Sequence, residues 1–434
     1  MEGFDLVIAG GFVVIFALIS ARLSKIFISA PMIFVGFGLL VGPKILDVVE
    51  LNLEHGFVHI LAEITLIIVL YSDASRIDLG VLKRNVGMPL RLLGLGLPLT
   101  IGLGILVGYF LFDEIGIWGV AILAAILAPT DAALGQAVVS NERIPIRIRQ
   151  ALNVESGLND GIAVPFLTVF IAAAGISGGL TSFTLQEVES GALTGTIFTL
   201  EQIGFGIIVG VVGGYTAASL MDISSRHGWM SPAFENIGMF AIPIVAFFFA
   251  EAVGGNGLIA AFMAGLTTGN VIRHVCLKFL DYSEEQADLL VLVTFMIFGG
   301  AFVGATLEDL TWEIVAYALL SLTVVRILPV SLALIGTGFH PKTMFFMGWF
   351  GPRGLASFVF ALQVVDRPDI AQAEEIFTIV VWTVLFSVVL HGITALPGVN
   401  WYGAHAEGIS NQPEKPELAE VETLPIRNQR HTKQ

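Results

Sequence analysis

Charged residues are scarce in this sequence. Only 13% of its 434 residues are Asp, Glu, Lys or Arg, whereas about a quarter is usual for a soluble domain. Hydrophobic residues make up 55%, and the mean hydropathy is +0.85. This composition excludes a soluble globular domain. It predicts an all-α protein that crosses a membrane many times.

Several other signals are missing as well. A single cysteine, Cys276, excludes a disulfide framework and a cysteine metal site. No GxxxxGK(S/T) motif occurs, so neither a nucleotide nor any other cofactor is expected. The net charge of −15 is spread along the chain, which argues against nucleic acid as a partner. The N-terminal MEGFDLVIAGG lacks a basic region, so we expect the first apolar span to remain rather than be cleaved as a signal peptide.

Long apolar stretches occupy most of the chain. A helix needs about 20 apolar residues to cross a ~30 Å hydrocarbon core, and thirteen stretches approach or exceed this length. They fall near residues 4–21, 27–46, 56–73, 87–111, 115–140, 147–175, 198–221, 232–252, 255–272, 285–305, 312–336, 345–364 and 373–398. We therefore expect thirteen transmembrane helices within residues 1–400. Residues 401–434 are polar and contain proline, so we expect a mobile cytoplasmic tail there.

The basic residues between these spans are distributed unevenly. Alternate loops on one side hold most of them, as cytoplasmic loops do in membrane proteins. That side carries Arg22, Lys25, Arg76, Lys83, Arg84, Arg143, Arg147, Arg149, Arg226, Arg273, Lys278 and Lys342. The loops of the opposite side carry only Lys44 and Arg367. The N-terminus is thus predicted to be external and the C-terminus cytoplasmic, in a plasma membrane such as the prokaryotic inner membrane.

Five charged residues lie inside apolar spans, where each costs at least ~2.5–3.5 kcal/mol. They are Asp131 in the fifth span, Glu155 and Asp160 in the sixth, Arg326 in the eleventh and Arg353 in the twelfth. At ~1.5 Å per helical residue, all five lie roughly 12–20 Å from the inner ends of their helices. Convergence at one depth predicts a functional site. The alternative is a set of separate polar contacts between helices.

Proline and glycine interrupt two of these spans. Pro129 in APTDAALG is predicted to break the fifth span at its centre, because proline lacks an N–H and disfavours helix at the preceding residue. Pro352, between Gly351 and Gly354 in GWFGPRGLAS, predicts a break in the twelfth. Two discontinuous helices seven spans apart predict inverted six-helix repeats, spans 1–6 and 8–13, with span 7 as the link. The alternative is that membrane helices merely tolerate these residues.

Oxygen donors gather around one acid of the sixth span. Ser156 and Asp160 lie four residues apart and so share one helix face. Asp131 and the backbone freed around Thr130 are expected to oppose them. Hard oxygen ligands of this kind suit an alkali cation or a proton, and the lack of converging His and Cys argues against a transition metal.

Opposite charges at the same depth need to be paired, because a lone buried charge is strongly destabilising. We expect Glu155 to pair with Arg326, which leaves Asp160 free to bind a proton or a cation in turn. If only the neutralised site can cross between the two sides, the protein exchanges a cation for protons. The prediction is therefore a transporter and not an enzyme.

Four motifs together resemble the monovalent cation:proton antiporter superfamily, and within it the NhaP-like, electroneutral branch of sodium/proton exchangers. They are APTD, ESGLNDG, VVRILPV and GPRG, and the resemblance covers about residues 1–400. It implies a homodimer of thirteen-helix protomers in membrane lipid. Residues 1–85 and 232–305 would form the dimer side, and residues 87–175 and 312–398 the moving core that carries the ion.

The resemblance also implies roles for single residues. The implied ligands of the cation and the proton are Asp160, Asp131, Ser156 and Thr130, and the supporting residues are Glu155, Arg326, Asn159 and Arg353. Asn159 stands where electrogenic relatives carry a second aspartate, which implies electroneutral one-for-one exchange. The family implies Na⁺ as the transported cation, with Li⁺ or K⁺ as alternatives.

Asp73 and the histidines lie outside this set. Asp73 in LYSDASRIDL either lines a cytoplasmic funnel or belongs to a solvated helix end. The eight histidines are expected mostly at span ends, at the membrane interface, rather than as pH sensors.

Three other classes of protein are less consistent with these residues. A cation channel could share the acids but would need a continuous pore lining. An intramembrane aspartyl protease would need a GxGD signature, which is absent, and Arg326 and Arg353 would be poorly placed in it. A symporter for an organic solute would need a larger pocket with aromatic or polar groups.

Overall fold

The computed structural model describes residues 3–23, 28–48, 55–84, 87–178, 185–272, 286–365, 367, 370, 372–409 and 416–418. All regular structure within these ranges is helical. The first half contains α1 (Gly3–Leu23), α2 (Ala30–Val41), α3 (His55–Arg76), α4 (Leu79–Arg84), α5 (Gly87–Arg91), the π-helical turn η1 (Leu92–Gly96), α6 (Leu97–Leu111), α7 (Gly116–Ile126), α8 (Ala132–Val139), α9 (Ile146–Gly178) and α10 (Leu185–Arg226).

The second half continues in the same way. It contains α11 (Pro232–Ala252), α12 (Gly257–Val271), a helix at residues 286–297, the π-helical turn η2 (Phe298–Val303), η3 (Leu307–Asp309), α14 (Trp312–Leu322), α15 (Val324–Ala333), α16 (Pro341–Trp349), α17 (Leu355–Val365), α18 (Ala373–Ile409) and η4 (Pro416–Leu418). Eight helical stretches in the described residues are long and apolar enough to cross a membrane, and five shorter apolar helices accompany them. The all-helical membrane fold is therefore confirmed, while the count of thirteen spans stays a prediction.

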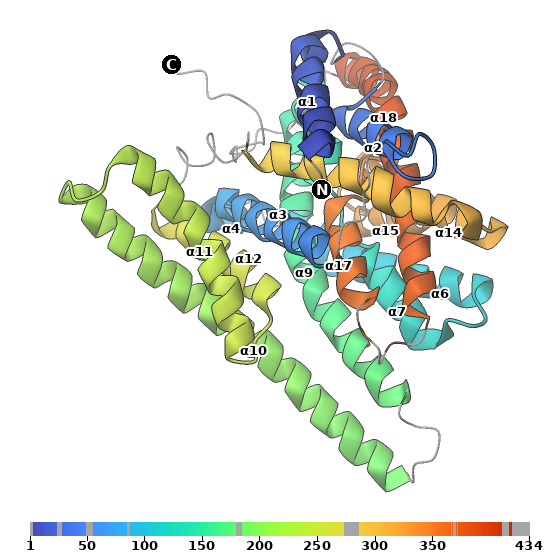
Figure 1. Cartoon of the computed structure of the whole chain (residues 1–434). Helices are drawn as coiled ribbons and strands as arrows, with labels where there is room; N and C mark the ends of the chain where they lie inside the picture. The colour runs from blue at the N-terminus through green and yellow to red at the C-terminus, as the bar shows by residue number, and fades with distance from the viewer. Residues whose placement is uncertain are drawn as a thin grey trace.

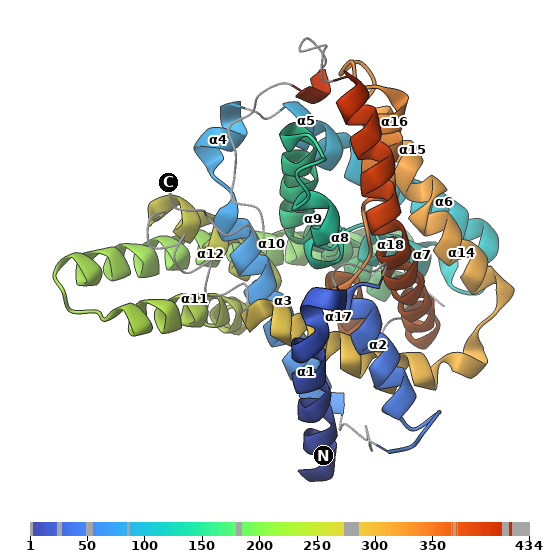
Figure 2. The same ribbon diagram turned by 90° about the horizontal axis from the view of Figure 1, so that it is seen from above.

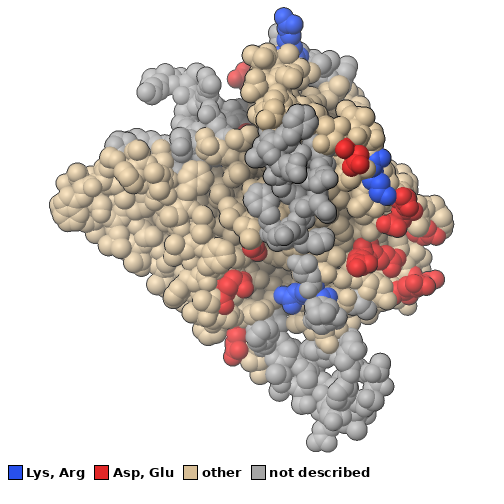
Figure 3. Space-filling model, viewed as in Figure 1, with Lys and Arg blue, Asp and Glu red and all other residues tan. Residues whose placement is uncertain are grey.

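Helix α9 runs between two groups of helices. In both ribbon views α10, α11 and α12 lie together on one side of it, and α6, α14 and α15 lie on the other (Figures 1 and 2). Helix α3 packs against both α12 and α9 and so joins the two groups. The face over α10 and α11 is largely free of charged side chains (Figure 3), as expected for a surface that contacts lipid.

Both predicted breaks are present. Residues 127–131 separate α7 from α8, and residues 350–354 separate α16 from α17. A third break, which was not predicted, lies at Thr323 between α14 and α15. Its side-chain hydroxyl donates to the Leu319 carbonyl at 2.6 Å, and such bonds bend helices.

Parts of the region predicted to be a tail have described structure. Helix α18 continues to Ile409, nine residues beyond the predicted boundary at 400. Farther on, the Glu417 carboxylate is buried and accepts the His340 backbone N–H at 2.7 Å, at the start of α16. The Thr343 hydroxyl also donates to this carboxylate, at 3.2 Å. Residues 410–415 and 419–434 lie outside the described residues, as do Lys25, Arg273, Cys276 and Lys278.

Polar contacts join loops that were predicted to share a side of the membrane. Lys44 Nζ lies 2.8 Å from Glu308 Oε1, which links two loops predicted to be external. At the opposite end, Arg143 Nη2 lies 3.0 Å from Glu407 Oε1, which links a predicted cytoplasmic loop to the end of α18. These contacts agree with the alternation of sides along the chain.

Glycines allow α12 to approach α3 closely. A Cβ added at Gly265 would collide with the Tyr71 carbonyl, and one added at Gly269 would collide with the Ser75 carbonyl. Small residues four apart are the usual way for membrane helices to bring their backbones together. The contact matters for the site because α3 also packs on α9.

We expect Gly269→Leu to destabilise the protein, because the added side chain must push the backbones of α3 and α12 apart. Overpacking of this kind costs about 1–3 kcal/mol. The measurement is the thermal midpoint of the purified protein in detergent. Gly102→Leu on α6 is the control, since nothing lies within 4 Å of a Cβ added there; equal midpoints for the two variants would contradict the close packing.

Candidate functional site at the crossing of two broken helices

The two breaks meet each other. The backbone N–H of Asp131 in segment 127–131 donates to the Pro352 carbonyl in segment 350–354 at 2.7 Å. The approach is close enough that a Cβ added at Gly354 would collide with the Asp131 carboxylate. Glycine is therefore required at position 354, which explains why the GPRG motif ends in glycine.

Asp131 caps two helices at once. Its Oδ1 accepts the N–H groups of Ala133 at 2.7 Å and Leu134 at 3.0 Å, at the start of α8. Its Oδ2 accepts the N–H of Leu355 at 2.8 Å, at the start of α17. A carboxylate at a helix N-terminus satisfies free N–H groups and offsets the positive end of the helix dipole. One acid performs this role for the second halves of both broken helices.

Arg353 serves the end of α7. Its Nη1 donates to the carbonyl of Ala128 at 2.6 Å and to that of Pro129 at 3.0 Å, and the side chain is fully buried. These carbonyls follow the last turn of α7, where helix geometry leaves acceptors unpaired. The backbone N–H of Arg353 donates in turn to Ser387 Oγ of α18 at 2.7 Å.

His391 serves the end of α16. Its Nε2 lies 2.8 Å from the Trp349 carbonyl, and its Nδ1 lies 2.9 Å from the Ser387 carbonyl. The same Nδ1 lies 3.3 Å from Ser387 Oγ. The pair Ser387 and His391 thus connects both ends of segment 350–354 to α18.

The sequence interpretation missed this histidine. It placed most histidines at span ends, whereas His391 is 2% exposed and lies in the interior of α18. The signal was present, since Ser387 and His391 are polar residues four apart within an apolar span, and polar groups at membrane depth are usually functional or paired.

Glu155 and Arg326 form a buried ion pair. Arg326 Nη1 lies 2.6 Å from Glu155 Oε1, and their side chains are 2% and 3% exposed. A Cβ added at Gly351 would press on the guanidinium of Arg326. The glycine of the broken span therefore makes room for the pair, which joins α9 to α15.

The surroundings of Asp160 differ from those of Asp131 and Glu155. It is 7% exposed, its Oδ1 is buried, and it has no hydrogen-bond or ion-pair partner among the described residues. The carboxylates of Asp131 and Asp73 are near enough for their charges to act on it. Asp73 itself is buried beside α9 and lies 3.5 Å from Arg76 Nε. Asp160 is thus an acid without a bound counter-charge.

The other two predicted ligands, Thr130 and Ser156, have hydrogen-bond partners of their own. Asn159 Nδ2 donates to Thr130 Oγ1 at 2.7 Å, and Ser156 Oγ donates to the Asn153 carbonyl at 3.2 Å. Asn159 therefore holds the broken segment of the fifth span against α9.

A small cavity lies beside these groups. Its volume is about 10 Å³, and its lining includes Thr130, Asp131 and Ser156. Such a volume is close to the minimum that admits one water molecule. Asp160 does not line it, so the structure places three of the expected ligands together and Asp160 one helical turn from Ser156.

The chemistry of the site follows from this division. Two acids are fixed, because Asp131 caps helices and Glu155 is paired with an arginine. Of these three acids, Asp160 alone has neither a helix end nor an ion pair among the described residues. A carboxylate in that position can bind a proton or a small hard cation, and either one removes its charge.

Known proteins resemble this chain over most of its length. Residues 11–401 match the family model of the transmembrane sodium/hydrogen exchangers. A K⁺/H⁺ antiporter, NhaP2, of Shewanella sp. strain MR-4 is 24% identical over 379 residues, which cover 86% of this chain and 63% of the relative. This chain thus spans less than two thirds of that protein's length. An Na⁺/H⁺ antiporter of Schizosaccharomyces pombe is 24% identical over 437 residues, covering 91% of this chain and 90% of the relative.

A solved structure has the same fold. The sodium proton antiporter MjNhaP1 of Methanocaldococcus jannaschii superimposes with a TM-score of 0.71 at 21% identity, over 90% of this chain and all of the other. The family match extends over both broken helices, the Glu155–Arg326 pair and Asp160. The chain belongs to the sodium/hydrogen exchanger family.

Proposed function

We propose that this protein exchanges a monovalent cation for protons across the membrane, with Asp160 as the group that carries each in turn. One observation supports this assignment above the others. Asp160 is the only one of the three acids at the crossing that has neither a helix end nor an arginine as partner within the described part of the chain. A buried charge without a partner is costly, and a bound cation or proton removes that cost.

Competition at one carboxylate couples the two fluxes. A proton and a cation each neutralise Asp160, so neither can bind while the other is present. If the core formed by residues 87–175 and 312–398 moves only when Asp160 is neutral, the gradient of one ion drives the other. The discontinuous helices carry the crossing in this core, in line with inverted repeats and with a homodimer held through the other helices.

Asp131, Thr130 and Ser156 are proposed to assist as oxygen ligands, and Glu155 with Arg326 to hold the core together. Asn159 donates to Thr130 and brings no charge, which supports an electroneutral exchange of one cation for one proton. Asp73, buried beside α9, is proposed to line the cytoplasmic approach.

Na⁺ is the first candidate for the transported cation. K⁺ is the second, because the Shewanella relative is named as a K⁺/H⁺ antiporter. Ligand types do not separate the two, since carboxylate and hydroxyl oxygens bind either.

The experiment that tests the function is Asp160→Asn in proteoliposomes. We expect the variant to fold and to lose cation-dependent dissipation of a pH gradient, because asparagine cannot exchange a proton for a cation. Asp113→Asn, an exposed acid in the turn before α7, is the matched control and should retain exchange. Exchange by Asp160→Asn at the wild-type rate would remove Asp160 from the mechanism.

Glu155→Ala should lower stability far more than it changes ion preference. Removal of one partner from a buried pair costs about 3–5 kcal/mol, since Arg326 would be left as an unpaired buried charge. Yield and thermal midpoint are the measurements, and Glu155→Gln with Arg326→Gln should recover part of the loss. A Glu155→Ala protein of normal stability but altered cation preference would instead place Glu155 among the ion ligands.

Voltage should leave the exchange unaffected if one charge crosses in each direction. The same vesicles are measured with Na⁺, Li⁺ and K⁺, with and without an imposed potential. We expect equal initial rates at both potentials. A rate that rises with potential would contradict electroneutrality, and a current far above carrier turnover would indicate a channel.

A further inference from the structure

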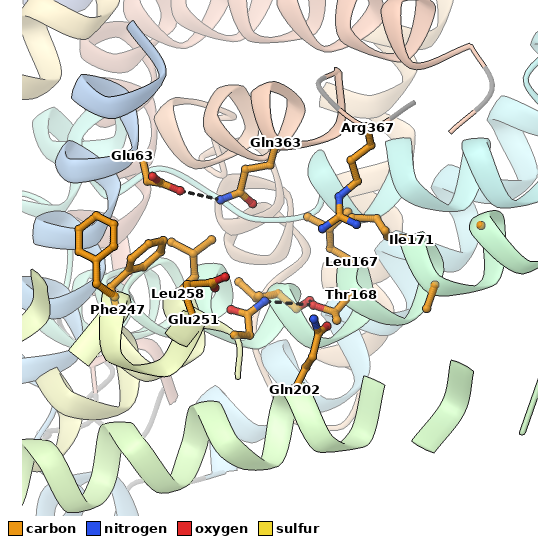
Figure 4. A pocket seen from close by; sticks show the side chains of 15 residues that line it. Glu63, Leu167, Thr168, Ile171, Gln202, Phe247, Glu251, Leu258, Gln363 and Arg367 are labelled. Atoms are coloured by element: carbon orange, nitrogen blue, oxygen red, sulfur yellow. Dashed lines mark hydrogen bonds between the residues drawn. The ribbon is translucent and has the colours of Figure 1, made fainter. Parts of the chain in front are cut away.

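A second polar cavity lies away from the crossing. Its volume is about 720 Å³, and its lining comes from α9, α17, α3, α10, α11 and α12 (Figure 4). At ~30 Å³ per water molecule it could hold on the order of twenty waters. It lies toward the helix ends that the loop charges predict to be external.

Glu63 is a carboxylate at membrane depth in this cavity. It lies eight residues from the start of α3, or ~12 Å along the helix. Its only hydrogen bond is from Gln363 Nε2 at 3.5 Å, and it forms no ion pair within the described ranges. A charged side chain at such a depth needs compensation, and no Lys or Arg among the described residues forms an ion pair with Glu63.

Glu251 contributes a second carboxylate to the same cavity. One of its oxygens accepts the Gly257 N–H at 2.7 Å, at the start of α12, which fixes the side chain in place. Its charge acts on that of Glu63. Arg367 also lines the cavity, but in Figure 4 it lies on the far side of Gln363 from Glu63. Two acids and one arginine leave the lining with a net negative charge.

The cavity ends one helical turn from Asp160. Val164 and Thr168 of α9 line it, and both lie on the face of α9 that carries Asp160. The step from Asp160 to Val164 is four residues, or ~6 Å. Val164 and Leu258 are 2% exposed and form an apolar floor. Helix α17 also runs from the crossing to the cavity. The N–H of its first residue donates to Asp131, and Gln363, near its other end, lines the cavity.

We propose that this cavity is an outer vestibule in which Glu63 and Glu251 hold a hydrated monovalent cation before it passes to Asp160. The passage of the cation to Asp160 rests on the proposed exchange, but the binding of the cation in the cavity does not. The volume favours an ion that keeps its water, and the hydroxyl of Thr168 and the amide of Asn256 lie within reach of that water. Ca²⁺ fits less well, because it takes six to eight oxygen ligands and one oxygen of Glu251 is already engaged.

The first test measures the charge preference of the cavity without any transport. Thr168→Cys is made in a Cys276→Ser background and labelled with a cationic and an anionic methanethiosulfonate of similar size. We expect the cationic reagent to react about tenfold faster, relative to a free thiol, because negative walls concentrate cations. High NaCl should reduce this ratio. Gln202→Cys on α10, across the cavity, repeats the test if the first variant does not fold.

Neutralisation identifies the carboxylates responsible. Glu63→Gln with Glu251→Gln should bring the labelling ratio close to that of a free thiol. Glu114→Gln removes one charge from an exposed turn on the same predicted side without touching the cavity, and should leave the ratio unchanged. An equal ratio with and without Glu63 and Glu251 would overturn the proposal.

The transport measurement connects the vestibule to exchange. In vesicles of one orientation, the double glutamine variant should raise the apparent KM for the cation about threefold to tenfold from the vestibule side only. The maximal rate should be unchanged. A KM that shifts equally from both sides, or not at all, would overturn the role in loading. Failure of this transport test would not affect the result expected for Asp160→Asn. Conversely, if Asp160→Asn retained exchange, the labelling result would still stand.

Discussion

Four helix ends buried at one point are the constraint on which the rest of the structure depends. Each end leaves backbone groups without helical partners, and in hydrocarbon each unpaired group costs several kcal/mol. Asp131 serves the starts of α8 and α17, Arg353 serves the end of α7, and His391 serves the end of α16. Asp131 and Arg353 thus place opposite charges at opposite ends of the broken helices.

This assignment explains why the acids of the crossing are not equivalent. Asp131 accepts backbone N–H groups from the starts of two helices, and Glu155 has an arginine at 2.6 Å. Both are fixed parts of the scaffold. Asp160 has neither kind of partner among the described residues, and the proposed exchange rests on this difference between the three acids.

The sequence predicted the positions of the breaks, because Pro129 and Pro352 act locally on the backbone. It also suggested the partner of Glu155, since Arg326 was expected at the same depth. It did not reveal that one acid caps two helices, because which helix ends meet depends on packing between distant segments. The extension of α18 was missed for the same reason, as its contacts with Arg143 and Thr343 come from elsewhere in the chain. The break at Thr323 was missed although its hydrogen bond to Leu319 is local, because a single threonine usually leaves a helix intact.

Helix α18 spans 37 residues, or ~55 Å, almost twice the thickness of the hydrocarbon core. Its middle holds the unwound segment through Ser387 and His391, and its far end contacts Thr343 through the Tyr402 hydroxyl at 2.9 Å. Helix α18 therefore contacts α16 near both ends of α16. If the crossing moves as proposed, the surface around the start of α16, ~20 Å away along α18, would therefore move with it.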